Sequence, residues 1–431
     1  MTNEIPQGKW ERSVAGSKTA AQMGSRLLKY YAQKPFLSED GRKKARTDLE
    51  KESARILFKG LGLLKGTAIK IAQLLSLELD IFPASIRMEL EKSYNQVPAM
   101  NQALVRKAIQ NAFGRSPERV FSTFDTQALA AASLGQVHQA TDQNGLPLAV
   151  KVQYPGIRST IKNDIQLIRN MARPLAEYDL IGPALEEIEA RLFEECDYQQ
   201  EARHIQFFAD HLKMKGLQIP EVRPEITTSN VLSMTFLPGK PLNLWLKSNP
   251  GQKARDAVAQ KLFDLFLAGL YELNCFHADP NPGNFLIRKD LTIGQIDYGC
   301  VKKLSPEFIY YYQQIPREFL NQDQETHFQL FQQLNLIRPD IEPAVQVQLF
   351  QMIKSFGQWF GKLYREEVFD FKANSDFIRE GRALPHTFLK FRRYMDVNPD
   401  FLFLNRTRYG LFRLFEQMGA RVRIRNPYEM G

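Results

Sequence analysis

The stretch His277–Asn284 constrains this chain more than any other. It reads His-Ala-Asp-Pro-Asn-Pro-Gly-Asn, and its prolines and glycine exclude a regular helix. Two short apolar runs follow at 284–288 and 292–296, on either side of a polar Lys-Asp turn, and this pattern predicts a two-stranded ribbon. The ribbon returns the chain from the loop to the acidic turn Asp297-Tyr298-Gly299.

This order of residues resembles the protein-kinase signature, in which a catalytic Asp is followed by an Asn and then by an Asp-Phe-Gly turn. The resemblance implies that Asp279 is catalytic and that Asn284 and Asp297 hold Mg²⁺ on the phosphates of ATP. A hard cation takes oxygen ligands, and phosphoryl transfer needs mainly positioning and charge neutralisation. Either half alone is more often a surface turn, but both halves at this spacing favour the kinase interpretation.

The composition is that of an ordinary globular protein. A chain of 431 residues with 44% hydrophobic content can bury a large core and is expected to form roughly two or three domains. Its cysteines, Cys196, Cys275 and Cys300, lie far apart without Cys-x-x-Cys spacing, and its histidines show no ligand pairing. We therefore expect a reducing compartment and no zinc site.

The sequence contains no pattern typical of a targeting or membrane-spanning segment. Its first residues, MTNEIPQGKWERS, include no apolar core, and no run of about eighteen apolar residues occurs. We expect a cytoplasmic protein that is soluble or peripherally attached to a membrane. The net charge of +9 is compatible with anionic partners such as nucleotide or lipid. No nucleic acid is expected as a partner, because no reader motif is present.

The chain is expected to divide into segments with different roles. The N-terminal segment mixes basic and small residues, and its role is unclear. In the next segment, apolar residues recur at helical spacing as far as about residue 79, which predicts a helical extension. It carries Lys70 and Gln73, three positions apart and so on one helix face. The segments are residues 1–47, the extension 48–115, an N-terminal lobe 116–237 and a largely helical C-terminal lobe 238–431.

Residues 127–141 are predicted to form a strand, a turn of small residues and a second strand. The turn lies where a kinase carries its glycine-rich phosphate loop, and its alanines let the backbone approach a phosphate but restrict positive φ. Lys151 follows among alternating apolar residues, as on the third kinase strand. A lone strand lysine is usually solvated, but after a phosphate-loop candidate it is expected to bind the phosphates. The other candidate nucleotide contacts here are Ala130, Ala131, Ala132, Ser133, Gly135, Gln136 and Val137.

An acidic helical region follows at about 181–209. A kinase needs one glutamate of such a helix to pair with the strand lysine, and spacing alone does not choose among those present. The apolar run 231–236 predicts a buried strand leading to the linker between the lobes, where Met234 and Phe236 are candidates to bond an adenine ring. A long amphipathic helix over 255–275 then brings the chain to the catalytic loop.

The sequence after Gly299 departs from that of a protein kinase. A helix is predicted from about Pro306, which leaves no room for an activation segment or the usual peptide platform. Further on, residues 401–415 interleave bulky apolar and cationic side chains at helical spacing. Such a helix can lie on anionic lipid, or it can pack its apolar stripe against the core of the lobe. The positive net charge and the missing platform favour the membrane.

These motifs together resemble the UbiB/AarF/ADCK family of atypical kinases. The resemblance covers the chain from about residue 48 onwards, through AAASLGQVHQA, LAVKVQYPGI, ECDYQQEA, HADPNPGN and IDYG in that order. It implies that Lys151 pairs with Glu201, and that Glu195 and Asp197 form the family's Glu-x-Asp motif. It also identifies Lys70 and Gln73 with the family's Lys-x-Gly-Gln motif.

The resemblance implies a bilobal α+β fold like that of protein kinases, with the helical extension over the nucleotide pocket. There the Lys-x-Gly-Gln motif, whose glycine is replaced by Ala72 in this chain, meets the Glu-x-Asp motif and blocks the groove for protein substrates. Family members use ATP and Mg²⁺ and are associated with coenzyme Q or other isoprenoid lipid metabolism. The implied partners are adenine nucleotide, an anionic or isoprenoid lipid at a membrane surface, and proteins of quinone biosynthesis.

Three functions are compatible with these features. The favoured one is a Mg²⁺-dependent ATPase or small-molecule kinase that supports isoprenoid-quinone or lipid metabolism. The second is a non-catalytic nucleotide switch, against which the complete set of catalytic residues argues. The third is an antibiotic- or choline-type phosphotransferase, which Gly299 and the Ala-rich loop disfavour.

Overall fold

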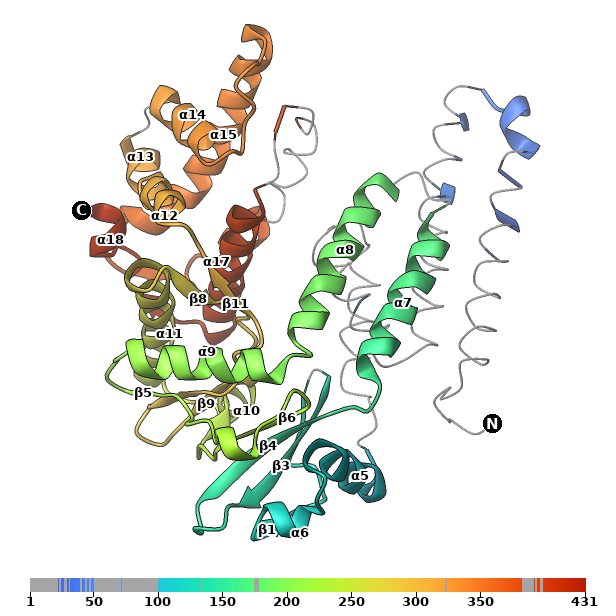
Figure 1. Cartoon of the computed structure of the whole chain (residues 1–431). Helices are drawn as coiled ribbons and strands as arrows, with labels where there is room; N and C mark the ends of the chain where they lie inside the picture. Colours follow the sequence, from blue (N-terminus) through green and yellow to red (C-terminus); the bar gives the residue numbers. More distant parts are fainter. Residues whose placement is uncertain are drawn as a thin grey trace. The chain divides into compact units, whose positions relative to one another are not determined.

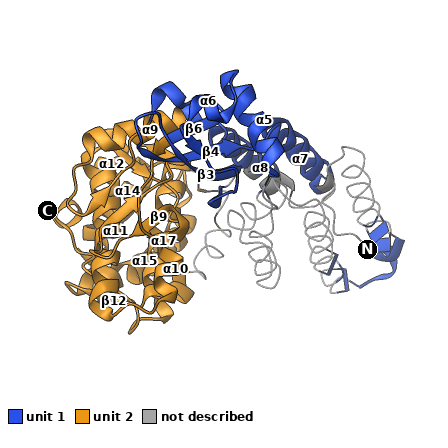
Figure 2. Ribbon diagram, turned by 90° about the horizontal axis from the view of Figure 1, so that it is seen from below, with its two compact units in different colours: residues 1–199, 223–233 blue, residues 200–222, 234–431 orange. Residues whose placement is uncertain are grey.

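The structure is a computed structural model of the chain, and it describes residues 100–132, 134–173, 178–321, 324–381 and 398–431, with isolated positions elsewhere. Lys70, Gln73 and Ser133 lie outside the described residues, as does most of the predicted extension. The described residues form two compact units, coloured in Figure 2. Unit 1 contains residues 1–199 and 223–233, and unit 2 contains residues 200–222 and 234–431.

Unit 1 is built on an antiparallel sheet whose strands follow the order β1-β3-β4-β6, with β2 also paired to β3 (Figure 1). Most of β4 is buried, and its apolar residues belong to the main core of the unit. The two strands predicted over 127–141 are confirmed as β2 and β3. The strands are β1 (Thr123–Phe124), β2 (Ala130–Ala132), β3 (Gly135–Thr141), β4 (Pro147–Gln153) and β6 (Val231–Thr235), whose last two residues fall in unit 2.

Helices complete unit 1, and α5 packs on β4 while α7 and α8 pack on each other (Figure 1). Helix α5 begins where the side chain of Asn101 accepts a hydrogen bond from the Leu104 amide, and it ends at Gly114 in the left-handed conformation; these are ordinary helix caps. The helices are α5 (Gln102–Phe113), α6 (Pro117–Val120), α7 (Ile157–Ala172) and α8 (Tyr178–Glu194), with a short 3-10 turn η3 (Pro224–Ile226).

The acidic region predicted as one helix over 181–209 is in fact two. Helix α8 ends at Glu194, and α9 (Tyr198–His211) begins after a break. The Asp197 carboxylate accepts a hydrogen bond from the Gln199 amide at 3.1 Å, as an N-terminal cap does. Glu195 and Asp197 therefore lie in a turn between helices, because a capping aspartate starts a new helix instead of continuing the old one.

Unit 2 contains a small sheet in the order β5-β10-β9-β7 and two isolated strand pairs, β8–β11 and β12–β13. The ribbon predicted after the catalytic loop is confirmed as β9 and β10, in which Phe285 faces Gln295. The strands are β5 (Leu217–Gln218), β7 (Lys240–Pro241), β8 (Cys275–His277), β9 (Phe285–Ile287), β10 (Ile293–Gln295), β11 (Val301–Lys303), β12 (Phe369–Asp370) and β13 (Arg421–Val422).

Helices make up most of unit 2. Helix α11 ends three residues before the predicted end at Cys275, because Asn274 turns the chain with φ of 50° and Cys275 begins β8. The helices are α10 (Leu242–Lys247), α11 (Gln252–Glu272), α12 (Pro306–Tyr312), α13 (Ile315–Asn321), α14 (Gln324–Gln333), α15 (Pro343–Arg365), α17 (Pro399–Met418) and α18 (Pro427–Met430).

Helix α17 corrects the prediction of a membrane-facing helix at 401–415. Leu404, Phe412 and Phe415 are at most 1% exposed, and Arg408 is as deeply buried as they are. The apolar stripe therefore packs against the core, which was the competing interpretation. Among the described residues, no helix is both long and apolar enough to span a bilayer.

Candidate functional site

The small-residue loop of unit 1 differs in detail from its prediction. Ala130, Ala131 and Ala132 form β2 and pair with β3, so the turn itself lies after them and not in the alanines. Gly135 stands opposite Gln153 on β4, and a Cβ atom at Gly135 would lie 2.3 Å from the Val152 carbonyl oxygen. A glycine is required at this position because no side chain fits between the strands.

Gln136 was expected to contact nucleotide, but its side chain is buried in unit 1. The side-chain oxygen accepts from the Met100 amide at 2.8 Å, and Nε2 lies 2.8 Å from Nε2 of His138. The other ring nitrogen of His138 is 2.8 Å from the Asp125 carbonyl oxygen. Since that oxygen only accepts, Nδ1 carries the proton and Nε2 accepts from Gln136. Only the backbone of Gln136 is left to meet a nucleotide.

Lys151 is buried on β4, directly across from Val137 on β3. Its ammonium lies 5.5 Å from the centre of the Tyr198 ring, a cation–π contact that helps to hold a desolvated lysine. The adjacent Gln153 side chain donates to the Cys196 carbonyl at 3.1 Å, which fixes the turn before α9 to the same strand. The sheet therefore presents the expected lysine beside the expected phosphate loop, within unit 1.

The catalytic loop of unit 2 is held by its own side chains. The Asp279 carboxylate accepts from the Asn281 amide at 3.2 Å and from Nδ2 of Asn284 at 2.9 Å. Asn281 in turn accepts from the Gly283 amide at 2.9 Å, at the start of a 3-10 turn η4 (Pro282–Asn284). Because the amide group of Asn284 donates towards Asp279, its carbonyl oxygen points away from that carboxylate. The loop thus keeps the side chains of Asp279 and Asn284 in fixed orientations.

Two backbone hydrogen bonds bring the loop next to the Asp297-Tyr298-Gly299 turn. The Ile296 amide donates to the Asn284 carbonyl at 3.1 Å, where the β9–β10 ribbon closes, and the Ala278 amide donates to the Cys300 carbonyl at 2.9 Å, beside β8–β11. The catalytic loop is therefore hydrogen-bonded to the Asp-Tyr-Gly turn region at both of its ends. Within the turn, the Asp297 carboxylate accepts from the Gly299 amide at 3.0 Å.

Tyr298 is fully buried and fixed along its whole length. Its amide donates to the Glu201 carboxylate at 3.2 Å, its carbonyl oxygen lies 3.1 Å from Nδ1 of His204, and its hydroxyl donates to Gln295 at 2.8 Å. Burial raises the pKa of Tyr298 well above the usual value. Helix α9 and strand β10 thus determine the conformation of the turn that carries Asp297.

The remaining predicted site residues are not brought together by these contacts. Lys151 belongs to unit 1 and Glu201 to unit 2, so their pairing stays a prediction. Met234 is buried in β6 and Phe236 is half-buried after it, and their adenine contacts also stay predictions. The same holds for the meeting of the Glu-x-Asp turn with Lys70 and Gln73, because these two residues are outside the described parts of the chain.

Two residues near the catalytic loop escaped the sequence analysis. The hydroxyl of Thr407 on α17 lies 3.2 Å from the Ala278 carbonyl oxygen, and Gly410 touches Pro280. Beside them is a small cavity of about 20 Å³, partly open to solvent, whose lining includes residues of α9, α11, α17 and the loop. The sequence contained one signal for this contact, which is Gly410 inside a helical pattern. A glycine there destabilises the helix, so its presence indicates that another part of the chain packs closely against it.

Comparison with known proteins identifies the family. A model described as "ABC1 atypical kinase-like domain" matches residues 92–331, more than half of the chain. The chain belongs to the ABC1 family of atypical kinase-like proteins. The match extends over the small-residue loop, Lys151, the catalytic loop and the Asp-Tyr-Gly turn. The resemblance to the UbiB/AarF/ADCK family is therefore confirmed, and the roles of the individual residues stay predictions.

Several ABC1 proteins resemble this chain over part of their length. "Atypical kinase COQ8, mitochondrial" from Saccharomyces cerevisiae is 27% identical over 83% of this chain and 72% of its own length. "Probable serine/threonine-protein kinase abkA" from Dictyostelium discoideum is 27% identical over 73% of this chain, which spans 59% of that relative. "Probable protein kinase UbiB" from Cellvibrio japonicus is 33% identical over 51% of this chain, but this covers only 41% of that relative.

A solved structure, described as the complex of Rv3197 with erythromycin from Mycobacterium tuberculosis, matches with a TM-score of 0.60. It covers 89% of this chain and 96% of that one at 22% identity. This likeness shows that the two proteins share a fold. The expected α+β, kinase-like fold with a helical C-terminal region is confirmed.

Proposed function

We propose that this protein binds ATP with Mg²⁺ and catalyses phosphoryl chemistry as an atypical kinase or ATPase. The observation that carries the proposal is the pair of backbone hydrogen bonds that joins the catalytic loop to the Asp-Tyr-Gly turn. They hold the loop carrying Asp279 and Asn284 beside the turn carrying Asp297. These side chains offer carboxylate and amide oxygens, which are the ligands that Mg²⁺ takes in phosphotransferases.

Each residue has one role in the proposal. Asn284 and Asp297 are the Mg²⁺ ligands, and Lys151 binds the α- and β-phosphates with its buried ammonium. Asp279 orients the acceptor, which is water or the hydroxyl of a small molecule, and accepts its proton. Mg²⁺, when bound, neutralises charge on the transferred phosphoryl group. Glu201 holds the Asp-Tyr-Gly turn through the Tyr298 amide.

The physiological role that we propose is support of isoprenoid-quinone or lipid metabolism, rather than phosphorylation of other proteins. Helix α12 begins at Pro306, soon after the Asp-Tyr-Gly turn, which supports the absence of a kinase-type peptide platform. The quinone connection rests on the family resemblance, as do lipid and quinone-biosynthesis proteins as partners. A cytoplasmic, peripherally attached location also remains a prediction, since the yeast relative is named as mitochondrial.

The proposal is tested by the thermal shift that ATP and Mg²⁺ produce together. Asp297→Asn keeps an oxygen that can accept from the Gly299 amide. It removes the negative charge that would bind Mg²⁺, so the Mg²⁺-dependent thermal shift is expected to disappear. Asp290→Asn is a matched control, because Asp290 accepts from the Thr292 amide at 3.0 Å in the same kind of turn. An undiminished shift in Asp297→Asn would remove the assignment.

Turnover distinguishes the enzyme from a nucleotide switch. If the purified protein hydrolyses ATP and Asp297→Asn abolishes this activity, the protein is an enzyme. Protein that shows the Mg²⁺-dependent shift without ATP hydrolysis, alone or with phenolic quinone precursors and vesicles, is a switch whose output is partner binding.

A further inference from the structure

We infer that helix α17 positions the catalytic loop, and that Thr407 and Gly410 are the positioning residues through which it does so. The inference rests on the proposed function, because it assigns a role in catalysis to contacts with that loop. Helix α17 lies far along the chain from the loop and matches none of the motifs that identify kinases.

Gly410 provides the closest contact. A Cβ atom at this position would lie 2.4 Å from Cγ of Pro280, the residue after Asp279, and real Cβ contacts do not become so short. Gly410 is helical, so it is not required for a left-handed backbone. A glycine inside a helix costs about 1 kcal/mol relative to alanine. The close approach of the loop explains why a glycine, and not an alanine, stands at position 410.

Thr407 provides the second contact, one helical turn earlier. It is 2% exposed, and its hydroxyl lies 3.2 Å from the Ala278 carbonyl oxygen and 3.0 Å from the Phe403 carbonyl oxygen. The Ala278 amide already donates to Cys300. The Ala278 amide is therefore bonded to the strand pair, and the Ala278 carbonyl oxygen shares the single Thr407 hydroxyl proton with the Phe403 carbonyl, immediately before the catalytic aspartate.

The loop is partly exposed, so its contacts with α17 limit how far it can move. Pro280 and Thr407 both line a small cavity of about 20 Å³, which has room for about one water molecule. On the other side, Asn281 and Gly283 are exposed. The loop's own hydrogen bonds hold its side chains, and α17 adds two further contacts, to Ala278 and to Pro280. Because the ring of Pro280 is rigid, a displacement of Pro280 must move the backbone of Asp279 as well.

The experiment uses the full chain and compares two glycine substitutions. Gly410→Ala forces a methyl group against Pro280. Gly361→Ala is the matched control, because Gly361 is also inside a long helix of unit 2, α15, and its nearest neighbour to an added Cβ is 4.0 Å away. A displacement of about 1 Å can cost on the order of 100-fold in rate. We expect kcat for ATP hydrolysis to fall by about that factor in Gly410→Ala, with KM for ATP and the melting temperature little changed.

A second pair of variants distinguishes the hydrogen bond of the Thr407 hydroxyl from the packing of its side chain. Thr407→Val removes the donor and keeps the shape, whereas Thr407→Ser keeps the donor. We expect kcat to fall in Thr407→Val and to be retained in Thr407→Ser. If both variants match the wild type, or if Gly410→Ala and Gly361→Ala have the same kcat, α17 does not position the loop.

Hydrogen exchange provides a readout that does not need activity. The amides of Asn281, Gly283 and Asn284 are bonded inside the loop, so a displaced loop exchanges them faster. We expect faster exchange of the 279–284 segment in Gly410→Ala only. A wild-type protein that does not hydrolyse ATP would contradict the proposed function, whereas unchanged exchange in Gly410→Ala would contradict the inference about α17.

Discussion

The catalytic loop and the residues around Arg408 both place charged groups inside unit 2, but they treat charge in opposite ways. In the loop, Asp279 and Asn284 are half-buried. Around Arg408, the guanidinium and the Glu429 carboxylate are each 1% exposed and form an ion pair. We call the second group the Arg408 cluster.

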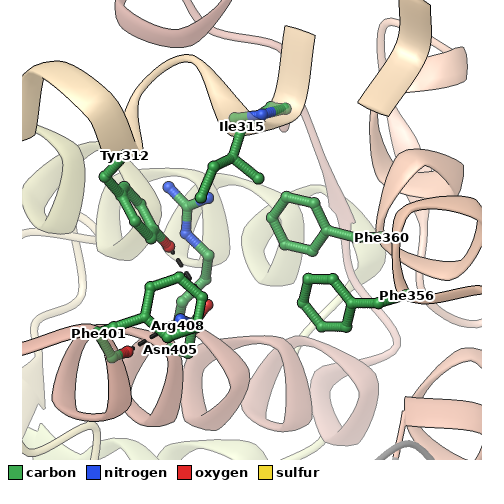
Figure 3. A pocket seen from close by; sticks show the side chains of 8 residues that line it. Tyr312, Ile315, Phe356, Phe360, Phe401, Asn405 and Arg408 are labelled. Carbon is green, nitrogen blue, oxygen red and sulfur yellow. Dashed lines mark hydrogen bonds between the residues drawn. The ribbon is translucent and has the colours of Figure 1, made fainter. Parts of the chain in front are cut away.

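The Arg408 cluster satisfies its charges internally. Glu429 accepts hydrogen bonds from Arg408 and, at 2.7 Å each, from Tyr271, Tyr364 and Asn426. Figure 3 shows the Arg408 side chain extending among Tyr312, Ile315 and Phe360, at the base of a small pocket. Burial lowers the pKa of Arg408, but the Glu429 carboxylate and the three neighbouring tyrosines together outweigh burial and keep that pKa well above its usual value.

The difference shows how to tell a functional charge from a structural one. Burial also raises the pKa of Tyr312 to about 12, so Tyr312 stays protonated near neutral pH. The cluster joins α17 to the C-terminal helix α18 through the ion pair. The loop leaves oxygens available, and available oxygens are what a metal requires. Three predictions test this contrast.

The largest effect is expected at Asp279. Asp279→Asn keeps one acceptor for the loop amides but cannot take a proton from the acceptor hydroxyl, so ATP turnover should fall by about 10²–10⁴-fold. The melting temperature should stay within a few degrees of the wild type. Steady-state hydrolysis and thermal unfolding measure both quantities, with Asp290→Asn as the control carboxylate. Turnover at the wild-type level would remove Asp279 from the mechanism.

The reverse result is expected in the Arg408 cluster. Glu429→Ala leaves the Arg408 charge buried and unpaired, which should lower the free energy of unfolding by about 3–5 kcal/mol. Denaturant unfolding measures the loss. The double variant Arg408→Met with Glu429→Leu removes both charges and should recover most of the stability. Equal stability of Glu429→Ala and the wild type would show that the pair is not structural.

The smallest effect concerns His138, a buried polar residue of unit 1. Burial lowers its pKa below 6.5, against the opposing effect of the Asp125 carbonyl. Below pH 6.5 the unfolded chain therefore binds the proton more readily. Stability should be unaffected above that pH and should fall below it, by at most about 1.4 kcal/mol per pH unit. Thermal melts from pH 5 to 8 should show a shallower acid loss in His138→Gln, and an identical loss would contradict the assignment.

The sequence predicted the parts of the molecule that depend on local patterns. The catalytic loop, its ribbon, β4 with Lys151 and the start of α12 follow from proline, glycine and alternation over a few residues. The family motifs were readable for the same reason, since their spacing is set by one loop or one turn. The break before α9 was missed because a capping aspartate in an acidic stretch resembles any other surface charge.

Contacts over long separations could not be predicted. The partners of Arg408 lie 21 and 44 positions away in the chain, and a cationic residue in an apolar stripe is equally typical of a membrane helix. The same limitation hid the contact between Gly410 and Pro280. Helix periodicity shows which residues share a face, but it does not show what that face meets.

The Arg408 cluster also has a consequence for synthesis of the chain. Tyr271 and its hydrogen-bond acceptor Glu429 are 158 positions apart, and translation at about 5–20 residues per second separates them by roughly 8–30 seconds. Until Glu429 has been made, the Arg408 guanidinium lacks its carboxylate partner, and α17 is not joined to α18. Unit 2 therefore completes its core, and with it the support behind the catalytic loop, only when its last helix has been made.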